Sequence, residues 1–420
     1  MTKTVTIVGQ GYVGLPLAQA AALAGWKVNG FDISTRVVHN LNAGISHIDD
    51  LSDQDIKDML AAGYEATTDV SVVSGSDMIV ICVPTPLGTA GAPDLGPVES
   101  ATKSIAPHLT TGTTVVLEST TYPGTTEEVC VPLIESNSDL KVGEDVFVAF
   151  SPERVNPGSK DFGIKNTPKL VGGVSPEATK RAVAFYSDFI DTVVEMSGAK
   201  EAETAKLLEN TFRHVNIALV NEMAKVCHEL GIDIWEVIRG AATKPFGFMK
   251  FTPGAGVGGH CIPIDPNYLS YEVRRQLGYP LRFVELAQEI NSSMPIYVVD
   301  RIAEKLNNER KALNGSNVLV LGVTYKADIA DQRESPARPV AKELLKRGAN
   351  VTFHDPRVSK WIVQDGVELE CVADLEAAIK EADVVALLQK HSEYDIAMIE
   401  SNAKVLLDSQ GNAAAAENRL

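Results

Sequence analysis

Short apolar runs alternate with helical patterns over the first part of the chain. Each run is rich in β-branched residues and ends in a glycine-, proline- or polar-rich turn. Helical stretches between such runs favour parallel pairing in a sheet that is buried on both faces. The pattern therefore predicts a doubly wound α/β domain over residues 1–198. The predicted strands are Thr4–Val8, Lys27–Phe31, Asp77–Val83, Thr113–Ser119 and Val146–Phe150.

This alternation stops near Ala199, where two long helical patterns take its place. Residues 200–230 show helical spacing without a proline, and residues 281–307 form a second long run. Helical spacing over that length predicts helices rather than strands. We therefore expect a central helical domain, 199–309, which would also supply the surface of a homodimer.

A second, smaller α/β unit follows the turn Asn314-Gly315-Ser316. It lacks a G-x-G-x-x-G motif, and its tail from Ala413 to Leu420 is small and polar, so we expect that tail to be frayed. The fold class predicted from the whole pattern is α/β, with two Rossmann-like doubly wound domains, 1–198 and 310–420, joined by the central helical domain. The elements predicted for the second unit are strands 317–321, 351–353 and 383–388 and a helix over 336–347.

The strongest motif for chemistry lies between the first two strands. Gly9-Gln10-Gly11-Tyr12-Val13-Gly14 follows a strand and opens a helix, and Asp32 ends the next strand. The first glycine makes the turn, the second admits a pyrophosphate, and the third lets the helix pack on the strand. Asp32 would accept from a ribose hydroxyl and repel a 2′-phosphate. The motif predicts an NAD site, and its alternative is a tight βα turn with nothing bound.

Three polar residues follow later strands of the same predicted sheet. Thr85, Thr120 and Glu153 each come just after an apolar run. In doubly wound sheets, ligands bind at the carboxyl ends of the strands. We therefore expect all three on the rim that faces the cofactor. The alternatives are that the threonines cap turns and that Glu153 is solvated or paired with Arg154.

The residues from Lys250 to Leu269 are rich in glycine and proline. Such a run cannot form a regular helix or a central strand, so we expect a shaped loop in which Cys261 lies in a tight pocket with Asp265 nearby. A buried structural cysteine is the alternative.

The first helix of the central domain carries a polar set at positions i, i+4 and i+7. Lys206, Asn210 and Arg213 therefore share one face of that helix. Their neighbours are apolar almost all round, which predicts a buried helix, and a buried lysine can be tuned for catalysis. A solvated lysine is the alternative. In the second α/β unit, Arg333 stands in a loop of mixed charge and could clamp a phosphate or carboxylate.

Composition narrows the range of partners. The 420 residues are 45% hydrophobic and 22% charged, and the net charge of −17 argues against nucleic acid or an anionic membrane as the main partner. Five scattered cysteines give no disulfide framework and fit a reducing compartment. No signal-peptide pattern or membrane-length apolar run is present. We expect a cytoplasmic protein without a bound metal.

Taken together, these motifs resemble the UDP-glucose dehydrogenase type of nucleotide-sugar 6-dehydrogenases over nearly the whole chain. The family implies an N-terminal NAD domain, a central dimerisation domain and a C-terminal domain that helps to bind UDP. The markers of the resemblance are Gly9–Gly14, Pro84-Thr85-Pro86, Ser119-Thr120 with Pro123-Gly124, Ser151-Pro152-Glu153, Glu201-Ala202-Glu203 leading to Lys206 and Asn210, Gly258-Gly259-His260-Cys261 with Asp265, and Tyr325-Lys326 with Arg333-Glu334-Ser335-Pro336.

The resemblance implies a double oxidation of a C6 alcohol to a carboxylate, with two NADH formed. Cys261 would be the nucleophile that holds the aldehyde as a thiohemiacetal and then as a thioester. Lys206 and Asn210 would stabilise oxyanions, Asp265 would act in proton transfer with a water or Lys206, and Glu153 with Thr120 would place the hydrolytic water. The residues assigned to the cofactor are Gly9, Gly11, Tyr12, Val13, Gly14, Asp32, Arg36, Pro84, Thr85 and Thr120. Those assigned to the substrate are Glu153, Arg154, Lys206, Asn210, Arg213, Phe251, Gly254, Gly258, Lys326 and Arg333. Arg333 would reach the substrate of its own subunit or, across a subunit boundary, that of the other.

Two departures from the family pattern leave details open. The second acid that follows Ser-Pro-Glu in some members is absent, which leaves Glu153 as the one candidate base, and Val37 stands where a basic residue usually follows the ribose-binding acid, with Arg36 one position earlier. The sequences of residues 210–218, 244–248 and 261–266 resemble those of the family members that act on N-acetylhexosamines. We expect UDP-N-acetylglucosamine as the substrate, with UDP-N-acetylmannosamine and then UDP-glucose as the alternatives.

Two other classes of function compete with this interpretation. A simple two-electron dehydrogenase, such as a 3-hydroxyacid type, would also have a Rossmann domain followed by helices, but it would need neither a cysteine nor a second α/β domain. An NAD-responsive binding protein would have no need to keep Cys261, Lys206 and Glu153.

Overall fold

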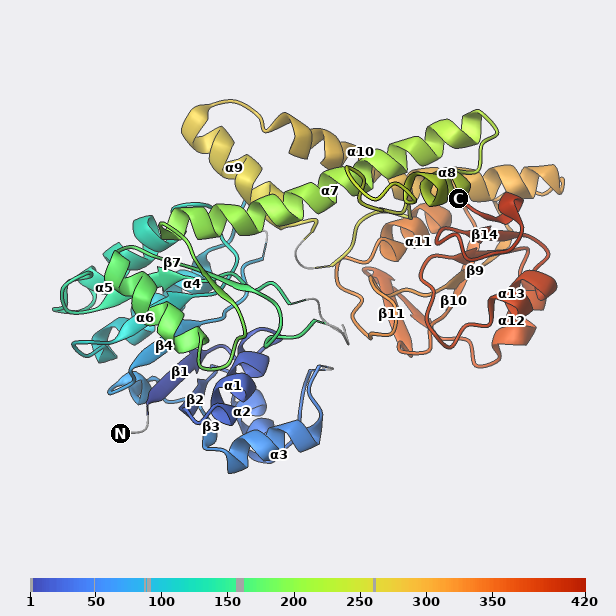
Figure 1. Ribbon diagram of the computed structural model, residues 1–420. Coiled ribbons are helices and arrows are strands. Elements are labelled where there is room, and N and C mark those ends of the chain that lie inside the picture. Colours follow the sequence, from blue (N-terminus) through green and yellow to red (C-terminus); the bar gives the residue numbers. More distant parts are fainter. Residues whose placement is uncertain (1–2, 49, 87, 89–91, 156–161, 260–261) are drawn as a thin grey trace. The chain divides into compact units, whose positions relative to one another are not determined.

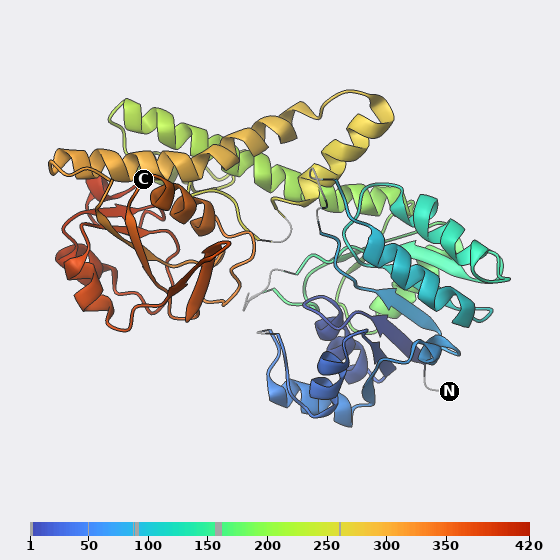
Figure 2. The same cartoon turned by 180° about the vertical axis from the view of Figure 1, so that it is seen from behind.

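The computed structural model describes residues 3–48, 50–86, 88, 92–155, 162–259 and 262–420 (Figures 1 and 2). The chain divides into two compact units. One comprises Met1–Glu209 with Asn267–Tyr279, and the other comprises Asn210–Pro266 with Pro280–Leu420. The finer division at residues 198 and 309 stays a prediction.

The first unit is built on an eight-stranded sheet in the order β3-β2-β1-β4-β5-β6-β7-β8. The pairs are parallel except that β6 and β7 are antiparallel. The order reverses between β1 and β4, so the carboxyl ends of these strands form the crevice where doubly wound folds bind ligands. The strands are β1 Thr4–Val8, β2 Lys27–Phe31, β3 Tyr64–Thr67, β4 Met78–Ile81, β5 Thr114–Leu117, β6 Phe147–Phe150, β7 Lys169–Gly173 and β8 Val193–Glu195.

Helices cover both faces of this sheet, as the sequence predicts. One core cluster packs α1, α2, α3 and α6 against the sheet, and a second cluster packs α4, α5 and the start of α7 against the other face. Every residue of β4 and β5 is buried, as expected of strands sandwiched between helices. The helices are α1 Gly14–Leu23, α2 Thr35–Asn42, α3 Asp53–Ala61, α4 Gly96–Ile105, α5 Val131–Ser136 and α6 Pro176–Tyr186, with short turns of helix at Val70–Val73, Ala106–His108 and Thr126–Cys130.

Four further helices lie between the two sheets in the sequence. They are α7 Ala199–Glu229, α8 Ile234–Ala241, α9 Asp265–Leu277 and α10 Arg282–Asn308. The two long helical patterns are therefore confirmed within two residues at each end. The loop prediction is wrong for its last residues, because α9 begins at Asp265. Pro266 falls at the first turn of this helix, where the missing N–H of proline costs nothing.

The second unit contains a four-stranded parallel sheet in the order β10-β9-β13-β14 and an antiparallel hairpin of β11 and β12. One core cluster packs α10 and α11 on this sheet, and another packs α12 and α13. The second Rossmann-like unit is thus confirmed. Its strands are β9 Asn317–Leu321, β10 Asn350–His354, β11 Lys360–Gln364, β12 Val367–Glu370, β13 Val384–Leu387 and β14 Leu406–Asp408, and its helices are α11 Ala337–Lys346, α12 Leu375–Glu381 and α13 Ile396–Asn402, with a short turn at Ala416–Asn418.

Both units build the same turn at the end of their first strand. In the first unit, Oδ2 of Asp32 accepts from the Gln10 amide, which follows Gly9, at 2.9 Å. In the second, Oδ2 of Asp355 accepts at 2.8 Å from the amide that follows Gly322. Both glycines have positive φ, 95° and 74°. Asp355 is buried and also receives the ring N–H of His391 at 3.0 Å, whereas Asp32 is only half-buried.

The C-terminal tail differs from its prediction. Ala413 and Leu420 are buried, and Arg419 pairs with Asp233 at 2.9 Å, so the tail is packed rather than frayed. The tail is held in place by the apolar contacts of its two ends, Ala413 and Leu420, and by the ion pair of Arg419 with Asp233. Within the described ranges, no helix combines the length and the hydropathy that crossing a bilayer requires.

Candidate active site

The glycine-rich turn after β1 has three differently constrained glycines. A methyl group on Gly9 would lie 2.6 Å from the Cys82 carbonyl oxygen, and one on Gly14 would lie 1.9 Å from the Gly9 carbonyl oxygen. A methyl group on Gly11 would meet no described atom within 4 Å. Gly9 and Gly14 therefore serve the packing of strand on helix, while Gly11 leaves open space beside the N-terminus of α1. Backbone N–H groups at a helix N-terminus suit a pyrophosphate.

The remaining predicted cofactor residues lie around this turn. Asp32 accepts from two backbone amides, Gln10 at 2.9 Å and Ser34 at 2.8 Å, and a carboxylate has further lone pairs for a ribose hydroxyl. Tyr12 is exposed, Val13 is half-buried, and Arg36 is exposed in the first turn of α2. The open glycine and the acid held at the next strand end fit the diphosphate and one ribose of NAD.

Two loops at the carboxyl edge of the sheet are tied together. The Ser119 hydroxyl donates to the Val83 carbonyl at 2.7 Å, which joins the loop after β5 to the loop after β4. The buried Tyr268 of α9 donates to the Thr85 carbonyl. Thr85 and Thr120 are half-buried and Pro84 is exposed. The two threonines therefore lie on linked loops at the sheet edge beyond β4 and β5, and β4 is the neighbour of β1, which precedes the glycine turn.

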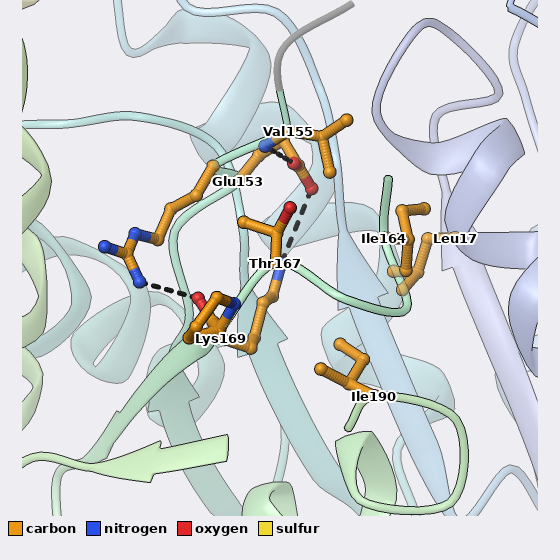
Figure 3. Close-up of a pocket in the computed structure, with 9 residues that line it drawn as sticks. Leu17, Glu153, Val155, Ile164, Thr167, Lys169 and Ile190 are labelled. Carbon is orange, nitrogen blue, oxygen red and sulfur yellow. Dashed lines mark hydrogen bonds and ion pairs between the residues drawn. The ribbon is translucent and has the colours of Figure 1, made fainter. Parts of the chain in front are cut away.

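Glu153, on the loop after β6, has its carboxylate held from two sides. One oxygen accepts from the Val155 amide at 2.5 Å, and the other lies 3.5 Å from the ammonium of Lys169 (Figure 3). The Lys206 ammonium, which is buried, donates to the Glu153 backbone carbonyl at 2.6 Å. The alternative that Glu153 pairs with Arg154 is wrong, because Arg154 pairs with Glu209 at 2.7 Å.

Two charged residues under Glu153 were missed by the sequence reasoning. Lys169 opens β7 and Glu118 follows β5, and both are buried and paired at 3.0 Å. Burial and the nearby Glu153 raise the pKa of Glu118 despite the Lys169 charge. The sequence did contain a signal for this pair, because each of the two residues stands beside an apolar run. Charged residues are rarely buried without a partner, so a lysine and a glutamate at such positions indicate a buried ion pair.

Another acid, Glu203, fastens the start of α7 to the Pro123-Gly124 turn. Its carboxylate accepts from the Gly124 amide at 2.6 Å, the Thr126 amide at 2.9 Å and the Thr126 hydroxyl at 2.7 Å. Burial raises the pKa of Glu203 to about 7 even though these donors lower it. The family marker Glu201-Ala202-Glu203 thus has a structural basis in its last residue.

The polar face of α7 does not have uniform surroundings. Lys206 is buried, Asn210 is half-buried and donates to the Asp265 carboxylate, and Arg213 is exposed. Leu208 and Phe212 are exposed as well, so the prediction of a helix buried all round is wrong. The structure joins Asn210 and Asp265 in one unit and Lys206 and Glu153 in the other.

The loop that leads to the predicted nucleophile packs tightly on the second unit's sheet edge. A methyl group on Gly258 would lie 2.8 Å from both the Glu334 carbonyl and the Tyr325 side chain. Gly259 has a φ of 95°, and a methyl group there would lie 3.0 Å from the Tyr325 ring. Cys261 itself lies outside the described residues. The last glycines of this loop are therefore required by close approach to Tyr325.

Two of the other predicted substrate residues of this unit, Gly254 and Phe251, belong to the same loop. The Gly254 amide donates to the buried Asn221 side chain at 3.0 Å. Phe251 contacts the Phe212 ring with 5.8 Å between centroids. Lys326 is half-buried, and the exposed Arg333 forms an ion pair with Asp331 at 2.8 Å. The roles of all these residues stay predictions.

Comparison with known proteins gives matches along the chain. Three models of the UDP-glucose/GDP-mannose dehydrogenase family match: the NAD binding domain over residues 3–190, the central domain over 200–293 and the UDP binding domain over 319–413. A UDP-N-acetyl-D-glucosamine 6-dehydrogenase of Pseudomonas aeruginosa is 36% identical over 84% of this chain and 83% of that protein. A UDP-N-acetyl-D-mannosamine dehydrogenase of Pyrococcus horikoshii is 35% identical over 95% and 92%. A solved UDP-D-ManNAc dehydrogenase structure from Pyrococcus horikoshii superposes with a TM-score of 0.89 at 33% identity, covering 97% of this chain and 95% of that one.

Proposed function

Because the chain belongs to the UDP-glucose/GDP-mannose dehydrogenase family and is an NAD-dependent enzyme of that kind, we propose that it oxidises the C6 alcohol of a UDP-N-acetylhexosamine to the carboxylate. The observation that carries the proposal is that one unit holds both parts of a dehydrogenase site. Its glycine turn leaves open space at Gly11, and Lys206 and Glu153 are hydrogen-bonded at its polar sheet edge. The relatives named above, which act on two such sugars, support the substrate class.

The first oxidation removes the hydroxyl proton and a hydride from C6, which leaves an aldehyde. Bound NAD would take up the hydride at this oxidation and again at the next, so two NADH form for each sugar. We assign to Cys261 the thiolate that adds to the aldehyde carbon, which forms a C–S bond and leaves an alkoxide on the former carbonyl oxygen. Loss of a second hydride from the same carbon turns this thiohemiacetal into a thioester.

Hydrolysis completes the reaction. A water loses a proton as its oxygen adds to the thioester carbon, the C–S bond breaks, and the thiolate of Cys261 leaves. Glu153 with Thr120 would place this water and take its proton. Lys206 and Asn210 would stabilise the oxyanions, and Asp265 would act in proton transfer with a water or Lys206.

NADH formed per sugar consumed tests this function. Purified protein with excess NAD is given limiting UDP-N-acetylglucosamine, UDP-N-acetylmannosamine or UDP-glucose in parallel. We expect a ratio near two on UDP-N-acetylglucosamine, since two hydrides leave C6. A ratio near one would remove the thioester, and a ratio of two on another of the three sugars would correct the substrate.

We also propose that the enzyme is a homodimer that buries an apolar stripe of α7. The stripe is exposed and recurs at intervals of seven, four, three and four residues, which places it on one helix face. Polar contacts between α7 and α10, such as Asn221 to Asn291 at 2.9 Å, leave this face outward. The residues of the stripe are Phe212, Leu219, Met223 and Val226 of α7 and Leu230, which directly follows the helix.

Leu219→Glu should split this dimer into monomers. A charge in the middle of an apolar interface loses its hydration, which costs several kcal/mol, roughly a thousandfold in affinity. Light scattering after size exclusion measures the mass. Ile362→Glu is the matched control, because Ile362 is 55% exposed and Leu219 53% exposed, and Ile362 lies on the β11 strand. A wild-type protein of monomer mass, or a dimer unchanged by Leu219→Glu, would contradict the proposal.

A further inference from the structure

A buried charge cluster lies under Glu153 and has no part in the chemistry described above. Lys169 is its centre: its side chain is 6% exposed, and its ammonium lies 3.0 Å from Glu118 and 3.5 Å from Glu153. The Glu118 side chain is fully buried, while that of Glu153 is 20% exposed. The lysine therefore joins an acid of the core to an acid of the pocket wall.

The core side of the cluster is fixed by further contacts. Tyr186, the last residue of α6, is fully buried and donates its hydroxyl to Glu118. The Lys169 ammonium also lies 5.2 Å from the centre of the Tyr186 ring. The Lys169 ammonium is thus held in one place by Glu118, which follows β5, and by Tyr186 of α6. Although burial lowers it, the two carboxylates raise the pKa of Lys169 above its usual value, so the ammonium is charged at neutral pH.

The pocket side is arranged for an ionised carboxylate. Both described partners of the Glu153 carboxylate are donors, the Val155 amide and the Lys169 ammonium. A protonated carboxyl would have to turn its O–H away from both donors, whereas an anion satisfies both and keeps lone pairs for a further ligand. Figure 3 shows Glu153 and Lys169 at one side of a pocket whose other side carries Leu17, Ile164 and Ile190.

We propose that Lys169 is a positioning residue for Glu153, which holds its carboxylate ionised at the wall of this pocket, while Glu118 and Tyr186 hold the Lys169 ammonium in place. The proposal deepens the proposed function, because an ionised carboxylate is the form that can take the proton of a hydrolytic water. It assigns to a lysine of the core a share in the hydrolysis step without contact with the substrate.

The charged and titratable groups around Glu153 come from strand β7, helix α7 and the segments that follow β4, β5 and β6. Lys169 and Glu118 are the nearest, and Lys206 of α7 reaches the Glu153 carbonyl. Arg154 is occupied by Glu209 and the Pro168 carbonyl, and the Cys82 thiol lies 4.0 Å from Glu118. Burial, then Glu118, raises the pKa of the Cys82 thiol well above its usual value, so Cys82 adds no charge near neutral pH. Among the described groups, Lys169 is therefore the cation that acts on the carboxylate itself.

The ionisation of Glu153 can be followed without a substrate. In protein labelled with carbon-13 at the glutamate carboxyl, the signal lost in Glu153→Gln identifies this residue. In Lys169→Met, we expect the Glu153 signal to convert to the acid form at a higher pH than in wild type, because an ammonium 3.5 Å away favours the anion, and we expect Lys169→Arg to restore the wild-type curve. An identical titration in wild type and Lys169→Met would overturn the proposal, whatever sugar the enzyme oxidises.

A double substitution separates positioning from simple charge balance. Lys169→Met leaves the buried Glu118 and the partly exposed Glu153 without their cation, so it should lower the melting temperature and slow uronate formation at least tenfold. Adding Glu118→Gln removes the buried core charge. We expect the melting temperature to recover and the rate to stay low, because Glu153 still lacks its ammonium; Glu118→Gln alone gives the baseline for the pair. Recovery of the rate together with stability would reduce Lys169 to a counter-ion of Glu118. If wild type oxidises none of the three sugars, the proposed function fails, and the carboxyl titration still decides the role of Lys169.

Discussion

Replacing Cys261 by alanine is expected to slow uronate formation by about a thousandfold or more, the scale expected when a group that acts directly in the chemistry is removed. Without a thiol, no thiohemiacetal holds the aldehyde, so the second hydride loss and the hydrolysis have no covalent intermediate. The sugar should stall before the carboxylate, and the ratio of NADH to uronate should depart from two. Quantifying NADH and uronate in one reaction measures both.

Cys371 offers the matched control for this substitution. It is half-buried and far along the sequence from the predicted loop, and its thiol accepts from the Asp355 amide at 3.5 Å, a bond that a serine hydroxyl can also make. Cys371→Ser should keep the rate and the ratio of two. Uronate formation at the wild-type rate in Cys261→Ala would return Cys261 to a structural role and favour a reaction without a thioester.

The second large effect is expected from two glycines only three residues apart. Gly14→Ala places a methyl group 1.9 Å from the Gly9 carbonyl oxygen, a backbone atom that cannot move without opening the strand–helix contact. We expect a loss of about 3 kcal/mol or more in the free energy of unfolding. Thermal or urea unfolding followed by circular dichroism measures it.

Gly11→Ala is the partner of that experiment. Its methyl group meets no described atom within 4 Å, so the protein should unfold at the wild-type temperature. The methyl group would instead occupy the space left for the diphosphate, so NAD affinity should fall at least tenfold, about 1.4 kcal/mol. Calorimetric titration with NAD measures this loss. Equal destabilisation by both substitutions, or unchanged NAD affinity in Gly11→Ala, would contradict the separate roles of the two glycines.

Much of the fold could be predicted from the sequence because its signals are local. The strand ends at Val8, Phe31 and Phe150 follow from apolar runs that stop at turn residues, and the long helices follow from unbroken helical spacing. The start of α9 was missed because prolines on both sides of Asp265 suggest a loop. A proline at the first turn of a helix, however, needs no donor.

The candidate site was harder to predict where it depends on contacts between distant residues. Glu153 followed from its place after a strand, but its partner Lys169 could not be identified, because the pair joins the loop after β6 to the first residue of β7, a strand that pairs antiparallel with β6. The tail was predicted to fray because of its composition. Leu420 is nevertheless buried, and Arg419 donates to Asp233, which lies 186 positions earlier in the sequence. Charge pairs of this kind leave no periodic trace in a sequence.

The turn that the chain builds twice shows that one backbone arrangement can leave its acid open in one unit and occupied in the other. Asp32 and Asp355 each accept from the amide that follows the first glycine, but the Asp355 oxygen also accepts from His391, and Asp355 is buried. An acid at the end of the second strand therefore belongs to the framework of the turn in both units, and the accessibility of its oxygens decides whether it can accept from a further ligand.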